Sequence, residues 1–173
     1  KTKTTGGSFL LEDHPLDNVF TPEDFNEDHL MIAKLADEFA TNEVLPATEK
    51  IEHKEWEITR ELLKKSAEMG LTNADVPAEY GGSEMDKVSS AIIADRMAKS
   101  GSFVVSMGGH AGIGTLPLVF FGTEEQKKKY LPKLASAEMV GAYALSEGTS
   151  GSDALNCRTK AVLSPDGKHY ILN

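Results

Sequence analysis

"VGAYALSEGTSGSD", residues 140–153, is the stretch at which the pattern of this chain changes. Upstream of it, apolar residues recur three and four positions apart, which is typical of amphipathic helices. Its own first half is apolar and compact and predicts a buried strand, whereas its second half is rich in glycine, hydroxyl and carboxylate groups. Downstream, "CRTKAVL" and "KHYILN" predict two further strands joined by the turn "SPDG". We therefore expect α-helix to about residue 138 and β structure from residue 140.

Several helices are expected before residue 138. The first begins with Thr21 as its cap and Pro22 in its first turn, and Pro46 interrupts it. The last begins with a capping box, in which Thr123 precedes Gln126 by three residues. The helices between them are expected over residues 55–69, over residues 87–99 and from about residue 103, with a break near residues 112–114.

Composition and charge exclude several classes of protein. The chain has 173 residues, of which 40% are hydrophobic and 26% charged, so a folded core is expected. Its net charge of −9 argues against nonspecific binding to nucleic acid or to an anionic membrane. No apolar stretch is expected to approach the ~18–20 residues that span a bilayer, and the first ten residues do not form a secretory signal. We expect a bacterial cytoplasmic protein in preference to one of the mitochondrial matrix.

The loop "SEGTSGSD" has three interpretations. It is not a serine-hydrolase elbow, because Ser152 stands where the pattern G-x-S-x-G requires its last glycine. A plain surface turn and a nest of backbone and hydroxyl donors for a polar ligand both remain open. Asp153 is interpreted as a turn carboxylate that accepts backbone N–H groups, not as a catalytic base.

Other candidate sites are weaker. The glycine-rich residues 108–117 lack the third glycine of a dinucleotide-binding motif, so we expect either close helix packing or a pocket wall without side chains. The five histidines are scattered, which predicts no metal site. His110 is the one histidine placed where a ligand can pass, although a satisfied structural histidine is the favoured interpretation. The single cysteine, Cys157, is interpreted as a small buried residue on a strand.

Three motifs in order resemble the acyl-CoA dehydrogenase family: "GLTNADVPAEYGG", "FFGTEEQKKKYLPKLASAE" and "YALSEGTSGSDALNCRTKAVLSPDGKHYILN". The resemblance covers roughly residues 25–173 and is strongest to the long- and very-long-chain branch. It implies a mainly α N-terminal helical domain followed by the first strands of a β-barrel domain, in a fragment of a longer protein. We accordingly expect an N-terminal arm over residues 1–22, a helical domain over 23–139 and an incomplete β domain over 140–173.

The resemblance also implies a reaction, the FAD-dependent α,β-dehydrogenation of a fatty acyl-CoA to a trans-2-enoyl-CoA. A carboxylate removes the α proton, the β carbon passes hydride to the flavin, and an electron-transfer flavoprotein takes the electrons. The catalytic glutamate is expected outside this chain, which leaves no catalytic residue within it, and a homo-oligomer, dimer or tetramer, is implied. Two alternatives stay open: an oxidase or monooxygenase relative, and a non-catalytic module that binds flavin or acyl-CoA.

The resemblance assigns site residues position by position. The residues expected to contact FAD are Tyr143, Leu145, Ser146, Gly151 and Ser152, and Ser152 is also expected to meet the CoA arm. The residues expected to line the acyl pocket are Val105, Ser106 and Gly109. Because medium-chain relatives carry bulky polar residues at these three positions, small or apolar ones imply a deeper pocket for long chains, at ~0.8 kcal/mol per buried CH₂. The alternative is that Gly109 merely permits close helix packing.

Overall fold

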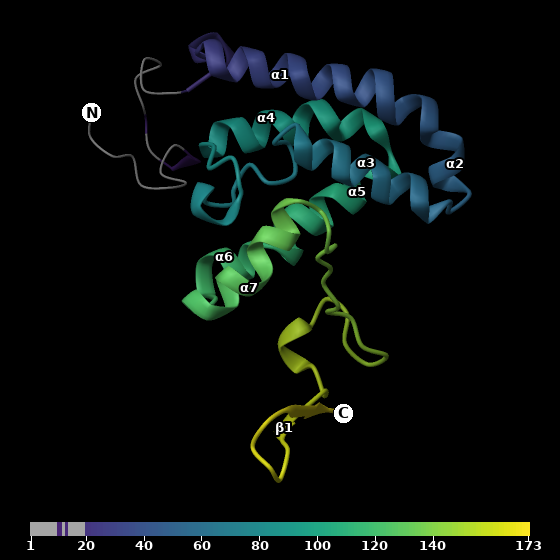
Figure 1. The fold of residues 1–173 in the computed structure, drawn as a ribbon, viewed down its shortest axis with the longest axis vertical. Coiled ribbons are helices and arrows are strands. Elements are labelled where there is room, and N and C mark those ends of the chain that lie inside the picture. The colour runs from purple at the N-terminus through teal and green to yellow at the C-terminus, as the bar shows by residue number, and fades with distance from the viewer. Residues whose placement is uncertain (1–9, 12, 14–19) are drawn as a thin grey trace.

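The computed structural model describes residues 10–11, 13 and 20–173, so most of the predicted arm over 1–22 lies outside the described residues. Helices form the bulk of the molecule, and a short β-hairpin stands apart from them at the end of the chain (Figure 1). This agrees with the predicted order of a helical segment followed by β structure. The elements are α1 (Glu27–Phe39), α2 (Thr48–Glu52), α3 (Trp56–Glu68), α4 (Lys87–Met97), α5 (Ser102–Gly108), α6 (Leu116–Phe121), α7 (Glu124–Ala135), β1 (Ala161–Leu163) and β2 (Tyr170–Leu172).

The first long helix begins later than the sequence predicted. Thr21 precedes only a 3₁₀ turn, Pro22–Asp24, and α1 starts after Asn26. The side chain of Asn26 accepts the N–H of His29 at 2.8 Å, and the N–H of Asn26 is donated to Nδ1 of His29 at 3.3 Å. This reciprocal cap satisfies two backbone donors, which is why the helix starts there.

The predicted interruption at Pro46 is confirmed. After α1 the chain passes through a π-helical segment, Ala40–Val44, and a 3₁₀ turn, Leu45–Ala47, before α2. Proline has no N–H to donate and its ring crowds the preceding turn, which disrupts the regular α-helical hydrogen bonds around Pro46. The main core forms here, where the rings of Phe39 and Phe103 meet with centroids 6.2 Å apart.

A second, smaller core joins α7 to the loop after α3. Leu131 and Leu134 on α7 pack with Val76 and Tyr80 of that loop. The predicted capping box at the start of α7 is confirmed, with bonds of 2.9 and 3.3 Å between Thr123 and Gln126. The Tyr80 hydroxyl donates to Glu124 at 2.8 Å, and this bond to a carboxylate raises the pKa of Tyr80 to about 12.

The expectation that no apolar stretch reaches the length of a bilayer span is wrong. Among the described residues, one helical run, Ser102–Phe121, is 20 residues long and apolar enough by length and composition to cross a membrane. Core helices of proteins without a membrane span meet the same test. Here α5 buries Phe103 and Met107 in the main core, and a π-helical segment, Gly109–Gly114, separates α5 from α6 near the predicted break.

Residues 140–146 are not the buried strand that was predicted. They have no regular structure, and Val140, Tyr143 and Leu145 are about half exposed. A strand requires a hydrogen-bonded neighbour, and none of the described residues supplies one to this segment. Apolar composition alone therefore gave the wrong local structure.

The predicted hairpin is present but short. β1 and β2 pair antiparallel, with Ala161 opposite Leu172 and Leu163 opposite Tyr170. All six side chains of the two strands are exposed. Cys157, which precedes β1, is also exposed, so its interpretation as a buried residue is wrong. A hairpin with both faces uncovered cannot bury the side chains of the residues beside it.

Candidate functional site

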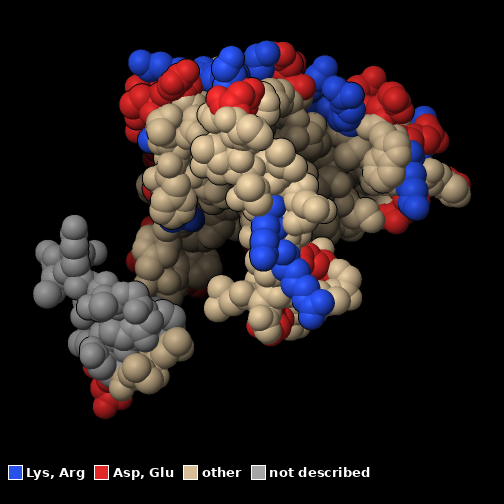
Figure 2. Space-filling model, turned by 90° about the horizontal axis from the view of Figure 1, so that it is seen from below, with Lys and Arg blue, Asp and Glu red and all other residues tan. Residues whose placement is uncertain are grey.

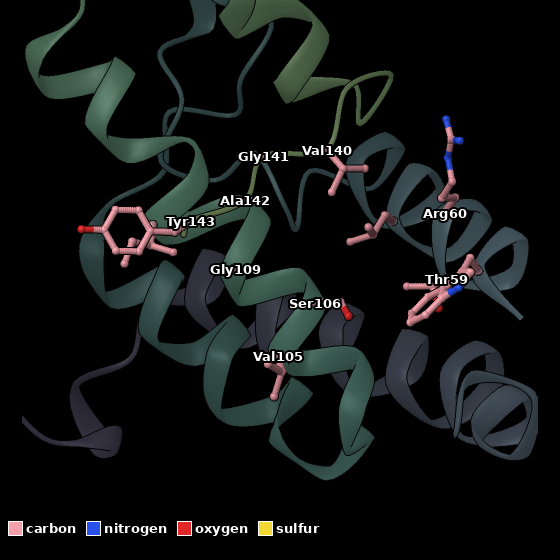
Figure 3. Close-up of a pocket in the computed structure, with 12 residues that line it drawn as sticks. Thr59, Arg60, Val105, Ser106, Gly109, Val140, Gly141, Ala142 and Tyr143 are labelled. Carbon is pink, nitrogen blue, oxygen red and sulfur yellow. The ribbon is translucent and has the colours of Figure 1, made fainter. Parts of the chain in front are cut away.

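A pocket of about 620 Å³ lies between α3 and the run that begins with α5, beside the chain segment 140–143. Figure 3 shows the helix of Val105, Ser106 and Gly109 facing the helix of Thr59 and Arg60. Its volume is in the range of small-molecule sites. Its lining residues are Trp56, Thr59, Arg60, Leu63, Val105, Ser106, Gly109, Ile113, Val140, Gly141, Ala142 and Tyr143.

One wall contains all three residues predicted for an acyl pocket. Val105, Ser106 and Gly109 share one face with Ile113, because positions four apart lie above one another on a helix. A Cβ atom added to Gly109 would meet nothing within 4 Å. Gly109 therefore does not serve close helix packing in this structure, and its missing side chain widens the pocket.

Close packing is instead the role of Gly114. A Cβ atom added to it would lie 2.6 Å from the carbonyl carbon of Gly141 and 2.9 Å from the nitrogen of Ala142. Both expectations for the glycine-rich stretch thus apply, but to different glycines. The contact at Gly114 brings the segment with Tyr143 against the helix and so forms the junction of two pocket walls.

His110 supports the same junction from inside. It is 1% exposed, and its Nδ1 accepts the backbone N–H of Gly141 at 3.0 Å. Burial lowers the pKa of His110, partly opposed by a hydrogen bond with the backbone of Leu134. A neutral imidazole with a bonded acceptor nitrogen is a satisfied structural histidine, as favoured from the sequence. It does not line the pocket.

The wall formed by α3 was missed in the sequence. Trp56, Thr59, Arg60 and Leu63 follow the spacing i, i+3, i+4 and i+7 of a single helix face. Leu63 and Thr59 are buried, whereas Trp56 is 61% exposed. The available signal was this mixture of a large aromatic, a hydroxyl and an arginine on one face, because a helix face that enters only the core rarely carries an arginine.

The loop after the pocket is organised by Glu147. Its carboxylate accepts the backbone N–H of Arg158 at 2.7 Å and of Thr159 at 3.0 Å. A hydrogen bond from the Thr159 side chain, followed by these two backbone bonds, holds the pKa of Glu147 below its ordinary value. The role predicted for Asp153 thus belongs to Glu147. The Asp153 carboxylate accepts instead the side-chain amide of Asn156 at 2.9 Å.

The residues predicted to contact a cofactor are divided by the structure. Tyr143 lines the pocket with the three acyl-pocket residues, and Figure 3 places Gly109 between it and the α3 wall. The other four, Leu145, Ser146, Gly151 and Ser152, lie outside the pocket on exposed chain. Ser150 is buried and donates its hydroxyl to the carbonyl of Asp153, so the exposed hydroxyls of the loop are those of Ser146, Thr149 and Ser152.

Charged side chains are unevenly distributed over the face seen from the hairpin end. Figure 2 shows acidic and basic side chains along the edge of the helical body, a tan area inside that edge, and a row of basic side chains in front of it. Within the described part of the chain, no three His, Cys, Asp or Glu side chains are grouped to hold a metal ion. The large exposed apolar residues include Phe120 and Phe121 on α6 and Leu155 before the hairpin.

The fold and the site together define a helical domain with a pocket, which passes beside that pocket into a loop and a β segment. This domain is that of a known enzyme family. Residues 26–138 match the acyl-CoA dehydrogenase N-terminal domain, and the chain belongs to the acyl-CoA dehydrogenase family.

Individual relatives agree with this assignment. The chain is 54% identical over 167 residues, 96% of its length, to a probable acyl-CoA dehydrogenase of Bacillus subtilis, of which it covers 28%. It is 41% identical over 128 residues, 73% of its length, to the human mitochondrial very long-chain specific acyl-CoA dehydrogenase, of which it covers 18%. Among solved structures, it superimposes with a TM-score of 0.93 and 55% identity on an acyl-CoA dehydrogenase from Bacillus anthracis complexed with FAD. That match covers 97% of this chain and 29% of the other. The chain thus spans less than a third of each of these three proteins.

Proposed function

We propose that this chain is the N-terminal part of an FAD-dependent acyl-CoA dehydrogenase that acts on long-chain fatty acyl-CoA in β-oxidation. The observation that carries the proposal is the pocket that Tyr143 lines together with Val105, Ser106 and Gly109. The family membership and the FAD complex of the Bacillus anthracis relative support it. The product is the trans-2-enoyl-CoA.

The α5 wall supports a long acyl chain. Gly109 leaves open space where a side chain would close the pocket, and Val105 and Ile113 extend an apolar surface along the same face. Each CH₂ group of substrate that leaves water for such a surface contributes ~0.8 kcal/mol. A longer chain therefore binds more tightly until the far wall, formed by α3, is reached. The relative that supports this part of the proposal is the human very long-chain specific enzyme.

The loop has the donor set that a flavin requires. An isoalloxazine ring needs an apolar wall and hydrogen-bond donors along its polar edge, and FAD, when bound, accepts the hydride from the substrate's β carbon. Tyr143 and Leu145 supply exposed apolar side chains, and Ser146 and Ser152 supply exposed hydroxyls that make no bond to the described residues. Gly151, exposed between these hydroxyls, leaves its backbone open to a ligand.

The residues of this chain bind and orient, and none of them is assigned as the base. Within the loop, the carboxylate of Glu147 is occupied by two backbone N–H groups and that of Asp153 accepts the side-chain amide of Asn156, so neither is assigned as the base. We place the catalytic glutamate in a later part of the protein. Ser146 supplies a donor for the ring edge on which reduction builds negative charge.

The same proposal assigns the domains and partners. Residues 23–139 form the helical domain, and residues 140–173 begin the middle β domain, whose further strands cover the exposed faces of β1 and β2. Electrons pass to an electron-transfer flavoprotein, and the enzyme is a homo-oligomer of the bacterial cytoplasm. The Bacillus relatives support the bacterial setting.

The test is anaerobic addition of palmitoyl-CoA to the full-length protein loaded with FAD. We expect the visible absorption of the flavin to bleach as it is reduced. A flavin that stays oxidised would refute the dehydrogenase and leave a non-catalytic binding module. Turnover that proceeds with O₂ as well as with an artificial electron acceptor would assign an oxidase instead.

A further inference from the structure

One side chain of the loop that carries Ser146 and Ser152 bonds to a later part of the chain. The two carboxylate oxygens of Glu147 accept the adjacent N–H groups of Arg158 and Thr159, which lie 11 and 12 residues further along the chain. Hydrogen bonds to an ionised carboxylate are about twice as strong as neutral ones, and two parallel bonds also fix its orientation.

The backbone of Glu147 fixes a second point. Its N–H donates to the carbonyl of Ser150 at 2.8 Å, and the N–H of Ser150 donates back to its carbonyl at 3.2 Å. The hydroxyl of Ser150 then donates to the carbonyl of Asp153. The interior of the loop is thereby bonded to itself, while Gly148, Thr149 and Ser152 face outward.

Arg158 and Thr159, which donate to Glu147, lead directly into the hairpin. Thr159 is followed by Lys160, whose N–H and carbonyl pair with those of Asn173 at 2.9 and 3.1 Å. Glu147 is therefore a direct connection between the start of the loop and the start of the sheet. If it were released, the loop would be held only by its own short-range bonds.

We propose that Glu147 is a positioning residue for the flavin site: it fixes the loop 146–153 against the hairpin so that the hydroxyls of Ser146 and Ser152 meet one ligand together. This inference rests on the proposed function. Glu147 touches no ligand itself, since both of its oxygens are bonded to backbone. It acts by reducing the number of loop conformations that FAD must otherwise select.

The test is FAD binding to the full-length apo-protein carrying Glu147→Gln. A glutamine has one acceptor oxygen for two N–H donors, and its NH₂ group opposes the second donor. We expect the dissociation constant for FAD to rise by about tenfold or more, and turnover at saturating FAD to recover most of the wild-type rate. Thr159→Val, which keeps the backbone bond, is expected to have a smaller effect of the same sign.

The matched control is Glu125→Gln on the exposed surface of α7, which is expected to leave FAD binding unchanged. A purely structural role for Glu147 would lower the unfolding midpoint of the apo-protein and leave the FAD dissociation constant of the folded fraction as in the wild type. That result would overturn the inference. A wild-type protein that binds no FAD would refute the proposed function instead, so the two failures are distinguishable.

Discussion

The backbone N–H of Gly141 donates to Nδ1 of the buried His110 at 3.0 Å. This bond ties the segment with Tyr143 to the middle of the long apolar helix. Gly114, four residues after His110, makes the approach possible, because any side chain there would meet the backbone of Gly141. One wall of the pocket is thus positioned by the hydrogen bond to His110 and by the absence of a side chain at Gly114.

Gly114→Ala and Gly109→Ala are expected to have opposite effects on stability. At Gly114 the new Cβ lies 2.6 Å from the Gly141 backbone, and such overpacking costs about 1–3 kcal/mol. At Gly109 the Cβ has open space, and replacing glycine in a helix by alanine stabilises by up to about 1 kcal/mol. Denaturant unfolding of the two full-length variants measures both. Equal free energies of unfolding would contradict the assigned roles.

His110→Ala is expected to destabilise the protein by about 2–4 kcal/mol. The substitution leaves the Gly141 N–H without its acceptor and opens a cavity in the core. The control is His169→Ala at an exposed position of the hairpin turn, which should change the free energy of unfolding by no more than about 0.5 kcal/mol. A loss at His110 as small as at His169 would show that the bond is dispensable.

His110 also predicts a pH dependence. Because burial lowers its pKa from the ordinary 6.5, the unfolded chain takes up this proton before the folded one. Stability is therefore expected to fall as the pH drops below 6.5, through the interval between the unfolded and the folded pKa. In His110→Gln this contribution is absent, and the slope of stability against pH should be smaller there. Parallel curves for the two proteins would rule out the contribution.

Asp86 predicts a second pH effect, in acid. Its carboxylate accepts the N–H of Ser89 at the start of α4 and the Nε2–H of His29, which lower its pKa to about 2. The stabilisation is present above the ordinary pKa of 3.8 and is lost as the pH falls toward 2. Because the side chain is 58% exposed, we expect it to amount to about 1 kcal/mol. Asp86→Asn keeps a good cap, so acid titration of its stability should lack this step.

Gly109→Glu is expected to change substrate preference in the full-length enzyme. The new side chain would occupy the open space of the pocket and reduce kcat/KM for palmitoyl-CoA by about tenfold or more relative to butyryl-CoA. Gly108→Glu is the matched control, since it also has free space but lies outside this pocket. If both variants kept the wild-type ratio of the two kcat/KM values, Gly109 would not set the depth of the acyl site.

Helical periodicity predicted the α segments well because the backbone hydrogen bonds of a helix join residues of the same segment. The capping box at Thr123 and the interruption at Pro46 depend only on neighbours within one turn, and both were correct. The sequence predicted the start of the first helix at Thr21, but the residues after Thr21 form only a 3₁₀ turn and the reciprocal cap of Asn26 and His29 starts α1.

Features that depend on distant partners were not predictable in the same way. Residues 140–146 read as a strand, but strand structure requires a neighbour that the described residues do not provide. The sequence of the loop does not show whether Asp153 or Glu147 accepts backbone N–H groups. That depends on where the chain returns, and it returns with Arg158 and Thr159 beside Glu147. The α3 wall, with Trp56 and Arg60, required knowledge of where two helices cross. The acyl-pocket residues Val105, Ser106 and Gly109 came from the family resemblance.

The π-helical segment Gly109–Gly114 has a consequence for how this protein tolerates insertion and deletion. An α-helix turns by about 100° per residue, so each residue gained or lost rotates everything that follows by that angle. Before the segment, Phe103 and Met107 belong to the main core; after it, Leu118 and Val119 pack on the second core. The segment therefore sets the rotation of α6 about the helix axis relative to α5, so that one helical run contributes side chains to both cores. A single-residue deletion in this segment would leave the sequences of α5 and α6 unchanged. It would rotate α6, so that Leu118 and Val119 would no longer face the second core.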